Sequence, residues 1–80
     1  MLSLFWLEKS DKMHFDYIKD KVKARREVLN VTQEQLAEIS GVGLRTLKQF
    51  ESGKGNPTLQ TLQKLANALG MEVKLEVKQL

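Results

Sequence analysis

Apolar residues recur at helical spacing along most of this chain, in segments separated by turn-forming residues. The first segment begins at Phe15. Its apolar stripe consists of Ile18, Val22 and Leu29, and charged residues lie outside it. Asn30 can end this helix, because asparagine tolerates the left-handed conformation that closes many helices. The pattern therefore predicts a first helix that begins at Phe15 and ends at Asn30.

The second segment opens on the sequence Thr-Gln-Glu-Gln, which is typical of a capping box. In that motif the Thr32 hydroxyl accepts a hydrogen bond from the amide of Gln35, and the Gln35 side chain reaches back to the amide of Thr32. The inward face of the predicted helix consists of Leu36, Ala37 and Ser40. Ile39 can lie on either face. Gly41-Val42-Gly43 then interrupts the pattern and predicts a tight turn.

A third helix is predicted from Leu44 to Glu51, with Leu47 and Phe50 facing inward. Residues 52–57 contain two glycines and the only proline, so they predict a loop. Thr58 then caps a fourth helix. The apolar stripe of this helix consists of Leu59, Leu62, Leu65, Ala66 and Leu69.

The period changes after Gly70, which ends the fourth helix. From Met71 to Lys78 apolar and charged residues alternate strictly, which is typical of a half-buried β-strand. No other segment of the chain is a convincing partner for this strand, so it must pair with another chain. We therefore predict a homodimer, formed through a strand whose apolar face consists of Met71, Val73, Leu75 and Val77.

The charges of this strand favour one register. In an antiparallel pair centred on Leu75, Glu72 faces Lys78 of the second copy, and Lys74 likewise faces Glu76. Centring the pair on either neighbouring charged residue opposes like charges, and so does a parallel in-register pairing. Centring it on a flanking valine avoids like charges but shortens the ladder. We expect an antiparallel ribbon centred at or near Leu75.

Length and composition narrow the class of protein. The chain has 80 residues and no cysteine, which predicts one domain without disulfides and fits the cytoplasm. A net charge of +3 mildly favours an anionic partner such as nucleic acid. The apolar run from Leu2 to Leu7 is too short to span a membrane. His14 is the only histidine and has no cysteine near it, so we expect no metal site. No Ser/His/Asp set can be assembled around it and no glycine loop that cradles a phosphate is present, so we expect no cofactor and no catalytic site.

The helix-turn-helix unit from Gln33 to Glu51 is the main functional candidate. A turn this short holds two helices at a steep angle, so that the second projects from the surface. The outward arc of the second helix consists of Leu44, Arg45, Lys48 and Gln49. Arginine pairs well with guanine, glutamine with adenine and leucine with a thymine methyl, whereas lysine suits a phosphate. An ordinary solvated face has the same composition, but the preceding helix and turn favour base contact.

Two further residues are candidates for phosphate contact. Gln33 lies in the first turn of the second predicted helix, where free amides and the positive end of the helix dipole attract anions. A plain capping turn also explains this position, and both roles can hold together. Lys54 follows the third helix, and a phosphate contact and a merely solvated position are about equally good interpretations of it.

Four strings of this sequence resemble a known family. They are Thr-Gln-Glu-Gln-Leu-Ala, Gly-Val-Gly-Leu-Arg-Thr-Leu, Phe-Glu-Ser-Gly-Lys and Pro-Thr-Leu-Gln-Thr-Leu-Gln-Lys-Leu-Ala-Asn-Ala-Leu-Gly. The segment from Gln33 to Leu69 is similar to the Cro/C1-type (XRE) helix-turn-helix domain, which implies a mainly α, four-helix, phage-repressor-like fold. By this resemblance Gln33 contacts a phosphate, and Arg26 forms a structural ion pair with Glu51. The base-contacting positions of the family fall on Leu44, Arg45 and Gln49.

The sequence departs from the family pattern at two places. Gly43 stands where the family more often has a serine or threonine cap, so the third helix begins without one. A predicted strand follows Gly70 in place of the fifth helix of many members. That strand resembles the HipB-type antitoxin branch, whose C-terminal strands pair across a dimer. The resemblance implies a HipA-type kinase toxin as partner and repression of a shared promoter.

We therefore expect a sequence-specific repressor that binds double-stranded DNA, at a palindromic operator, as a homodimer and away from membranes. The expected division of the chain is an N-terminal extension (1–14), a helix-turn-helix DNA-binding domain (15–70) and a C-terminal dimerisation strand (71–80). Two alternatives stay open. One is a stand-alone repressor without a toxin, and the other is a protein-interaction module whose main role is to bind a toxin or another partner.

Overall fold

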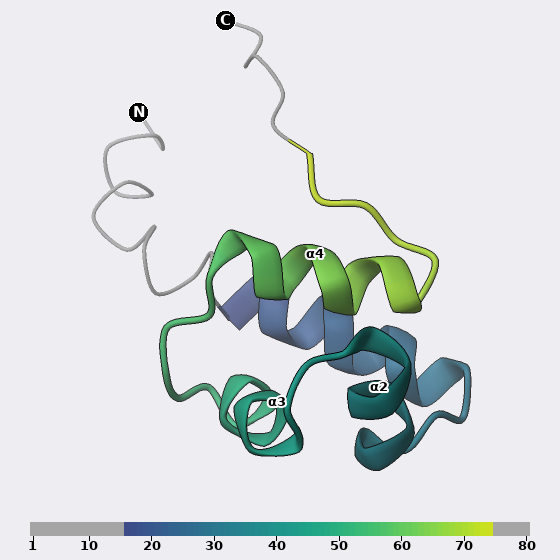
Figure 1. The fold of residues 1–80 in the computed structure, drawn as a ribbon. Helices are drawn as coiled ribbons and strands as arrows, with labels where there is room; N and C mark the ends of the chain where they lie inside the picture. The colour runs from purple at the N-terminus through teal and green to yellow at the C-terminus, as the bar shows by residue number, and fades with distance from the viewer. Residues whose placement is uncertain (1–15, 75–80) are drawn as a thin grey trace, which may run out of the picture.

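The computed structural model of this chain describes residues 16–74. The expectations for residues 1–14 and 75–80 lie outside this part of the chain. Residues 16–28 are helical, and three further helices follow: α2 (Gln33–Ser40), α3 (Leu44–Glu51) and α4 (Leu59–Ala68). In Figure 1 α4 crosses the top of the helical body, with the first helix behind it and with α2 and α3 below. The mainly helical, four-helix architecture predicted from the sequence is confirmed.

Side-chain caps fix where α2 and α4 begin. The Thr32 hydroxyl accepts a hydrogen bond from the amide of Gln35 at 3.0 Å, and the amide of Thr32 donates to Gln35 Oε1 at 2.9 Å. Both halves of the predicted capping box are therefore present. The Thr58 hydroxyl accepts from the amide of Thr61 at 3.1 Å, as predicted for the start of α4. Each cap satisfies an amide that the helix itself leaves without a partner.

Left-handed residues end the first helix and α2. Asn30 has a φ of 57°, which asparagine tolerates better than most side chains. Gly41 has a φ of 78°, and its amide donates to the carbonyl of Ala37 at 3.0 Å. A Cβ at position 41 would meet nothing within 4 Å, so the backbone conformation rather than crowding favours glycine there.

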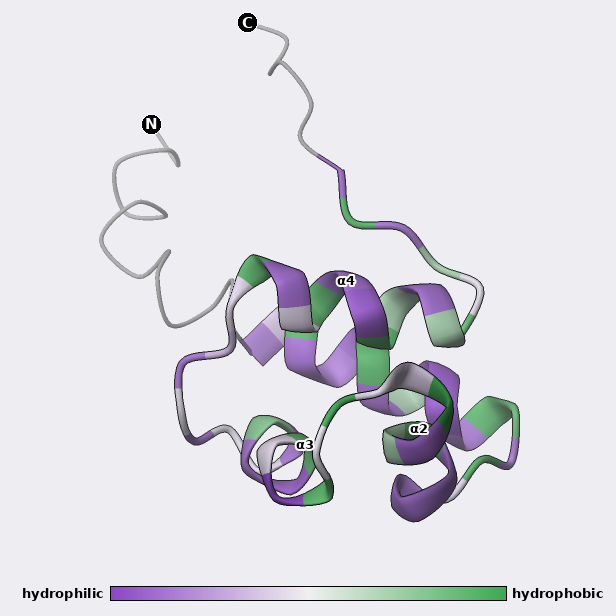
Figure 2. Cartoon of the chain, viewed as in Figure 1, coloured by the Kyte–Doolittle hydropathy of each residue, from purple (hydrophilic) through white to green (hydrophobic). Residues whose placement is uncertain are grey.

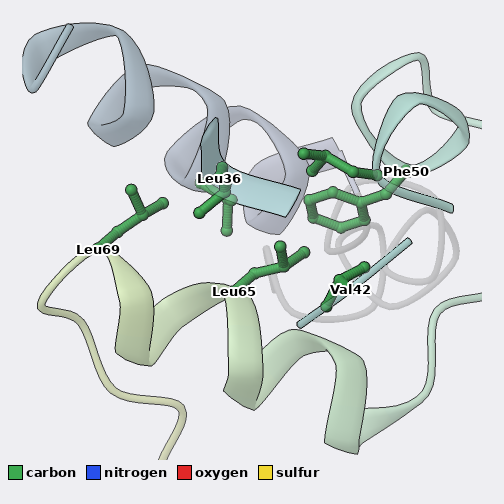
Figure 3. Close-up of a cluster of buried hydrophobic side chains, with 7 residues drawn as sticks. Leu36, Val42, Phe50, Leu65 and Leu69 are labelled. Atoms are coloured by element: carbon green, nitrogen blue, oxygen red, sulfur yellow. The ribbon is translucent and has the colours of Figure 1, made fainter. Parts of the chain in front are cut away.

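One apolar core joins all four helices. Figure 2 shows apolar and polar residues on different faces of the helices, and Figure 3 shows five core side chains pointing toward one another. The buried cluster consists of Val22, Leu36, Val42, Leu47, Phe50, Leu65 and Leu69. Its burial is the main favourable term that holds α2 against α3 and α4. Arg25 adds a polar link, because its Nε donates to the carbonyl of Leu69 at 3.0 Å.

Several residues of the predicted apolar stripes lie at the surface instead. Leu59 is 57% exposed, and Ile18 and Leu29 are exposed as well. Leu59 is the first residue of α4 and Leu29 follows the last helical residue of the first helix, so both lie beyond the region where helices pack. Ile39, which the pattern left open, faces outward. Val42 is buried although it lies in the glycine turn, where the helical period gives no signal.

The described part of the predicted C-terminal strand is not a strand. Residues 71–74 have no regular secondary structure, and residues 75–80 lie outside the described part. The amide of Met71 donates to the carbonyl of Ala66 at 2.8 Å, and its side chain packs against the core of its own chain. A strand forms only when a second strand satisfies its ladder, and residues 16–74 of one chain provide none. No helix within the described residues is long and apolar enough to cross a membrane.

Candidate nucleic-acid interface

A short turn connects α2 to α3 and fixes their relative orientation. Leu36 of α2, Val42 of the turn and Leu47 of α3 are all buried in the same cluster. Gly43 is the N-cap of α3 and makes no side-chain hydrogen bond there. The turn is therefore held by apolar packing on its inner side, while α3 begins without a side-chain cap.

The α3 helix has a buried face and a polar face. Leu47, Phe50 and Glu51 are buried. Of the four residues predicted on its outward arc, Arg45, Lys48 and Gln49 are exposed, whereas Leu44 is half-buried. Thr46, which is not part of the predicted outward arc, is exposed as well. The exposed side chains provide hydrogen-bond donors and acceptors that complement the acceptors and donors on the edges of DNA bases.

Glu51 lies at the centre of a buried hydrogen-bond network. Arg26 Nε donates to Glu51 Oε2 at 2.7 Å, and Arg26 Nη2 donates to Glu51 Oε1 at 2.9 Å. The structure thus brings together the two residues expected to form an ion pair, in bidentate geometry. Gln33 Nε2 also donates to Glu51 Oε1, at 3.0 Å. Arg26 Nη1 donates to the carbonyl of Val31 at 2.8 Å.

This network joins three elements of the fold through the first and last residues of the helix-turn-helix unit. Arg26 comes from the first helix, Gln33 from the first turn of α2, and Glu51 from the last turn of α3. The side chains of Arg26 and Glu51 are only 12% and 3% exposed. The hydrogen bond from Glu51 raises the pKa of Arg26 above its ordinary value, which outweighs the effect of burial. The guanidinium therefore stays charged at every working pH.

Gln33 has a different environment from the one its sequence position suggested. One of its amide hydrogens points to Glu51. A glutamine amide has two N–H donors, so one donor is left for a further partner such as a phosphate. No local sequence signal predicts the contact with Glu51, because the two residues are 18 positions apart.

The turn after α3 packs back onto the helix. The carbonyl of Gln49 accepts hydrogen bonds from the amide of Lys54 at 2.8 Å and from the Ser52 hydroxyl at 2.9 Å. A shallow hollow lies between the helix and the turn, and its wall includes Thr46, Gln49, Lys54 and Gly55. Lys54 is exposed and stands beside the polar face of α3.

The exposed charged side chains of α3 and of the turn after it all carry a positive charge. From Leu44 to Pro57 the cations are Arg45, Lys48 and Lys54, and all three are exposed. The only acidic residue of that segment is Glu51, which is buried and paired with Arg26. A surface with exposed cations and no exposed carboxylate favours an anionic partner such as a phosphate backbone.

Comparison with known proteins identifies the family. The helix-turn-helix family model matches residues 22–75. The transcriptional repressor RstR of a cryptic CTXphi phage in Vibrio cholerae is 39% identical over 56 residues, which cover 70% of this chain and 50% of RstR. The immunity repressor protein of Bacillus phage phi105 is 38% identical over 56 residues, 70% of this chain and 39% of that protein. The control protein C.SmaI of Serratia marcescens is 40% identical over 58 residues, 72% of this chain and 69% of its own length.

The chain thus spans half or less of the two phage repressors, but most of C.SmaI. No solved structure matches it. The matched segment includes all of α2, α3 and α4, together with Arg26 and the turn after α3. The two phage relatives are repressors by name. The chain belongs to the XRE-type (Cro/C1-type) helix-turn-helix family of transcriptional regulators.

Proposed function

We propose that this protein is a sequence-specific repressor that inserts α3 into the major groove of its operator. The observation that carries the proposal is the exposed cationic surface of α3, from which the single acidic side chain is withdrawn into the core. A helix of this size fits the major groove of B-DNA, where the four base pairs present distinct patterns of donors and acceptors.

The polar face of α3 divides into base-contacting and phosphate-contacting positions. Arg45 is suited to guanine, Gln49 to adenine, and the half-buried Leu44 to a thymine methyl. Lys48 and Lys54, which are both exposed, are suited to phosphates. Gln33 is the third proposed phosphate contact, through the amide hydrogen that Glu51 does not use.

Binding measurements with alanine variants test this assignment. Arg45→Ala should reduce the preference for one base pair by about 1–3 kcal/mol and leave the other positions of the operator unchanged. Lys54→Ala should weaken binding to all sequences and reduce the salt dependence by about one counterion. Lys64→Ala is the matched control, because it removes the same charge from the exposed surface of α4. Uniform weakening by Arg45→Ala would show that Arg45 contacts no base.

We also propose that the protein is a homodimer joined by its C-terminal segments. Within the described residues the backbone groups of 72–74 make no hydrogen bond, as expected of a strand that awaits a partner. An apolar groove runs beside this segment, lined in part by Tyr17, Ile18, Leu62 and Val73. A second copy that pairs through this segment would cover part of that groove. Such a dimer would suit a palindromic operator, with its two recognition helices about 34–36 Å apart.

A charge swap tests the proposed register. In a pair centred on Leu75, Lys74 faces Glu76 of the second copy. Lys74→Glu should therefore oppose like charges and raise the dimer dissociation constant, while Lys74→Glu combined with Glu76→Lys should restore it. Sedimentation equilibrium measures both. Dimers that are equally stable in all three proteins would contradict this register.

We propose further that the repressor is the antitoxin of a toxin–antitoxin pair. The support is the resemblance of the alternating C-terminal segment to that of HipB-type antitoxins. Co-expression with the product of the adjacent gene, followed by purification of a tagged copy, tests the proposal. A stable complex with a kinase-like protein would support it, whereas purification without a partner would favour a stand-alone repressor.

A further inference from the structure

The side chain of Gln49 lies against the turn that follows its own helix. A Cβ built on Gly55 would be 3.9 Å from both Gln49 Cβ and Gln49 Oε1. The carbonyl of the same glutamine accepts the hydrogen bonds from Ser52 and Lys54. The Gln49 carbonyl is therefore hydrogen-bonded to this turn, and the Gln49 side chain borders the same hollow as Gly55, although the residue is exposed on the polar face of α3.

Gly55 leaves room for the Gln49 side chain because it has no side chain of its own. Its φ of 82° lies in the left-handed region, so the turn that brings it onto α3 favours glycine for its backbone as well. An alanine Cβ would touch Gln49 at an ordinary contact distance. A longer side chain would occupy the space into which the glutamine amide extends.

We propose that Gly55 is a positioning residue for base recognition, because its lack of a side chain leaves free the space that the Gln49 side chain occupies in the conformation that meets its base. A longer side chain at position 55 would displace the glutamine amide from this space, and moving the amide back before binding would add to the free-energy cost of the base contact. Gly55 itself need not contact the DNA. The inference deepens the proposed function and rests on the base contact of Gln49.

Three glycine variants separate the effect of a side chain placed next to Gln49 from the effect of a changed backbone conformation. Gly55→Asn keeps the left-handed conformation, which asparagine tolerates, but adds a side chain next to Gln49. Gly53→Asn is the matched control, because Gly53 has a φ of 85° and its Cβ would face Lys19 rather than Gln49. Gly55→Ala strains the backbone more than asparagine does but adds only one atom beside Gln49.

The measurement is the affinity of each variant for the operator and for its single-base-pair variants, made below the melting temperature of every protein. Gln49→Ala should lower discrimination at one base pair by about 5- to 150-fold, the range of a good bidentate contact. Gly55→Asn should lower discrimination at that same base pair and have no further effect when combined with Gln49→Ala. Gly53→Asn and Gly55→Ala should keep it.

Two results with the variants would overturn the proposal. If Gln49→Ala lowers discrimination and Gly55→Asn does not, Gly55 does not position Gln49, although the base contact stands. If Gln49→Ala changes no single base pair, the base contact itself is wrong and the inference falls with it. In the unaltered protein, nuclear Overhauser effects between the Gly55 α-protons and the Gln49 side chain are also expected, and their absence would refute the proposed proximity without any variant.

Discussion

Replacing Glu51 by alanine removes the acceptor of three hydrogen bonds from the interior of the domain. Two of the three donors belong to the guanidinium of Arg26, which would stay buried and charged with only its bond to the carbonyl of Val31. Gln33 would lose its partner as well. In the described part of the chain, no other acidic residue forms a hydrogen bond with this guanidinium.

The size of the effect follows from the burial of the pair. An exposed ion pair contributes at most about 1 kcal/mol to stability. The Arg26 and Glu51 side chains, however, are only 12% and 3% exposed, so this pair is buried. Breaking a buried pair by removing one partner costs about 3–5 kcal/mol, because the other charge is left without compensation. A domain of this size has about 4–12 kcal/mol of stability in all. Glu51→Ala should therefore lower the melting temperature by about 12–40 °C.

Urea and thermal denaturation followed by circular dichroism measure this loss. Glu38→Ala is the control, because Glu38 is exposed on α2 and forms no ion pair with any residue of 16–74. The melting temperature of this variant should stay within a few degrees of that of the unaltered protein. The double variant Arg26→Met with Glu51→Leu should recover much of the stability, since it leaves no buried charge. Equal denaturation midpoints for Glu51→Ala and Glu38→Ala would refute the structural role of the pair.

Three further changes have definite expected outcomes. Leu65→Ala, at a fully buried position, should cost about 2–5 kcal/mol in chemical denaturation, while Leu59→Ala on the exposed start of α4 should cost less than about 0.5 kcal/mol. Gly43→Ser supplies the missing cap of α3 and should raise the melting temperature by about 1–3 °C with unchanged operator binding; an unchanged or lower value would argue against the cap. Removal of residues 75–80 should leave a folded monomer that binds the operator much more weakly, and a stable dimer after removal would contradict the proposed interface.

The helices of this fold are predictable from sequence because their signals are local. The capping box at Thr32 and the cap at Thr58 each lie within four residues of the helix that they begin. The glycine turn before Leu44 marks the start of α3 in the same way. Local hydrogen bonds of this kind depend on few residues, so a single sequence contains the information needed to place them.

Burial at the helix ends and across the turn is harder to predict. Helical periodicity assigns a face to every residue but does not say how far the packing extends, and so it predicted burial for the exposed Leu29 and Leu59. It gave no role to Val42, because that residue lies where the period is broken. Both errors arise because burial depends on which elements meet in space.

Some features of the candidate site are likewise predictable from local sequence, and others are not. The exposure of Arg45 and Gln49 follows from their wheel positions opposite Leu47, and the wheel alone predicts it. The contact of Gln33 with Glu51 and the proximity of Gln49 to Gly55 both arise only in the folded chain. The proposed C-terminal strand would need a second chain, so neither the periodicity nor the fold of one copy is sufficient to establish it.

Selection of operator sequences from a random DNA library tests the central claim most directly. The unaltered protein, Arg45→Ala and Gln49→Ala would each be taken through the same rounds of binding and sequencing. We predict that the unaltered protein enriches a palindromic site with a guanine in each half-site, and that each alanine variant loses the preference at one position per half-site while keeping the rest. Enrichment of no particular sequence, or the same site for all three proteins, would contradict the claim that α3 recognises bases through these two side chains.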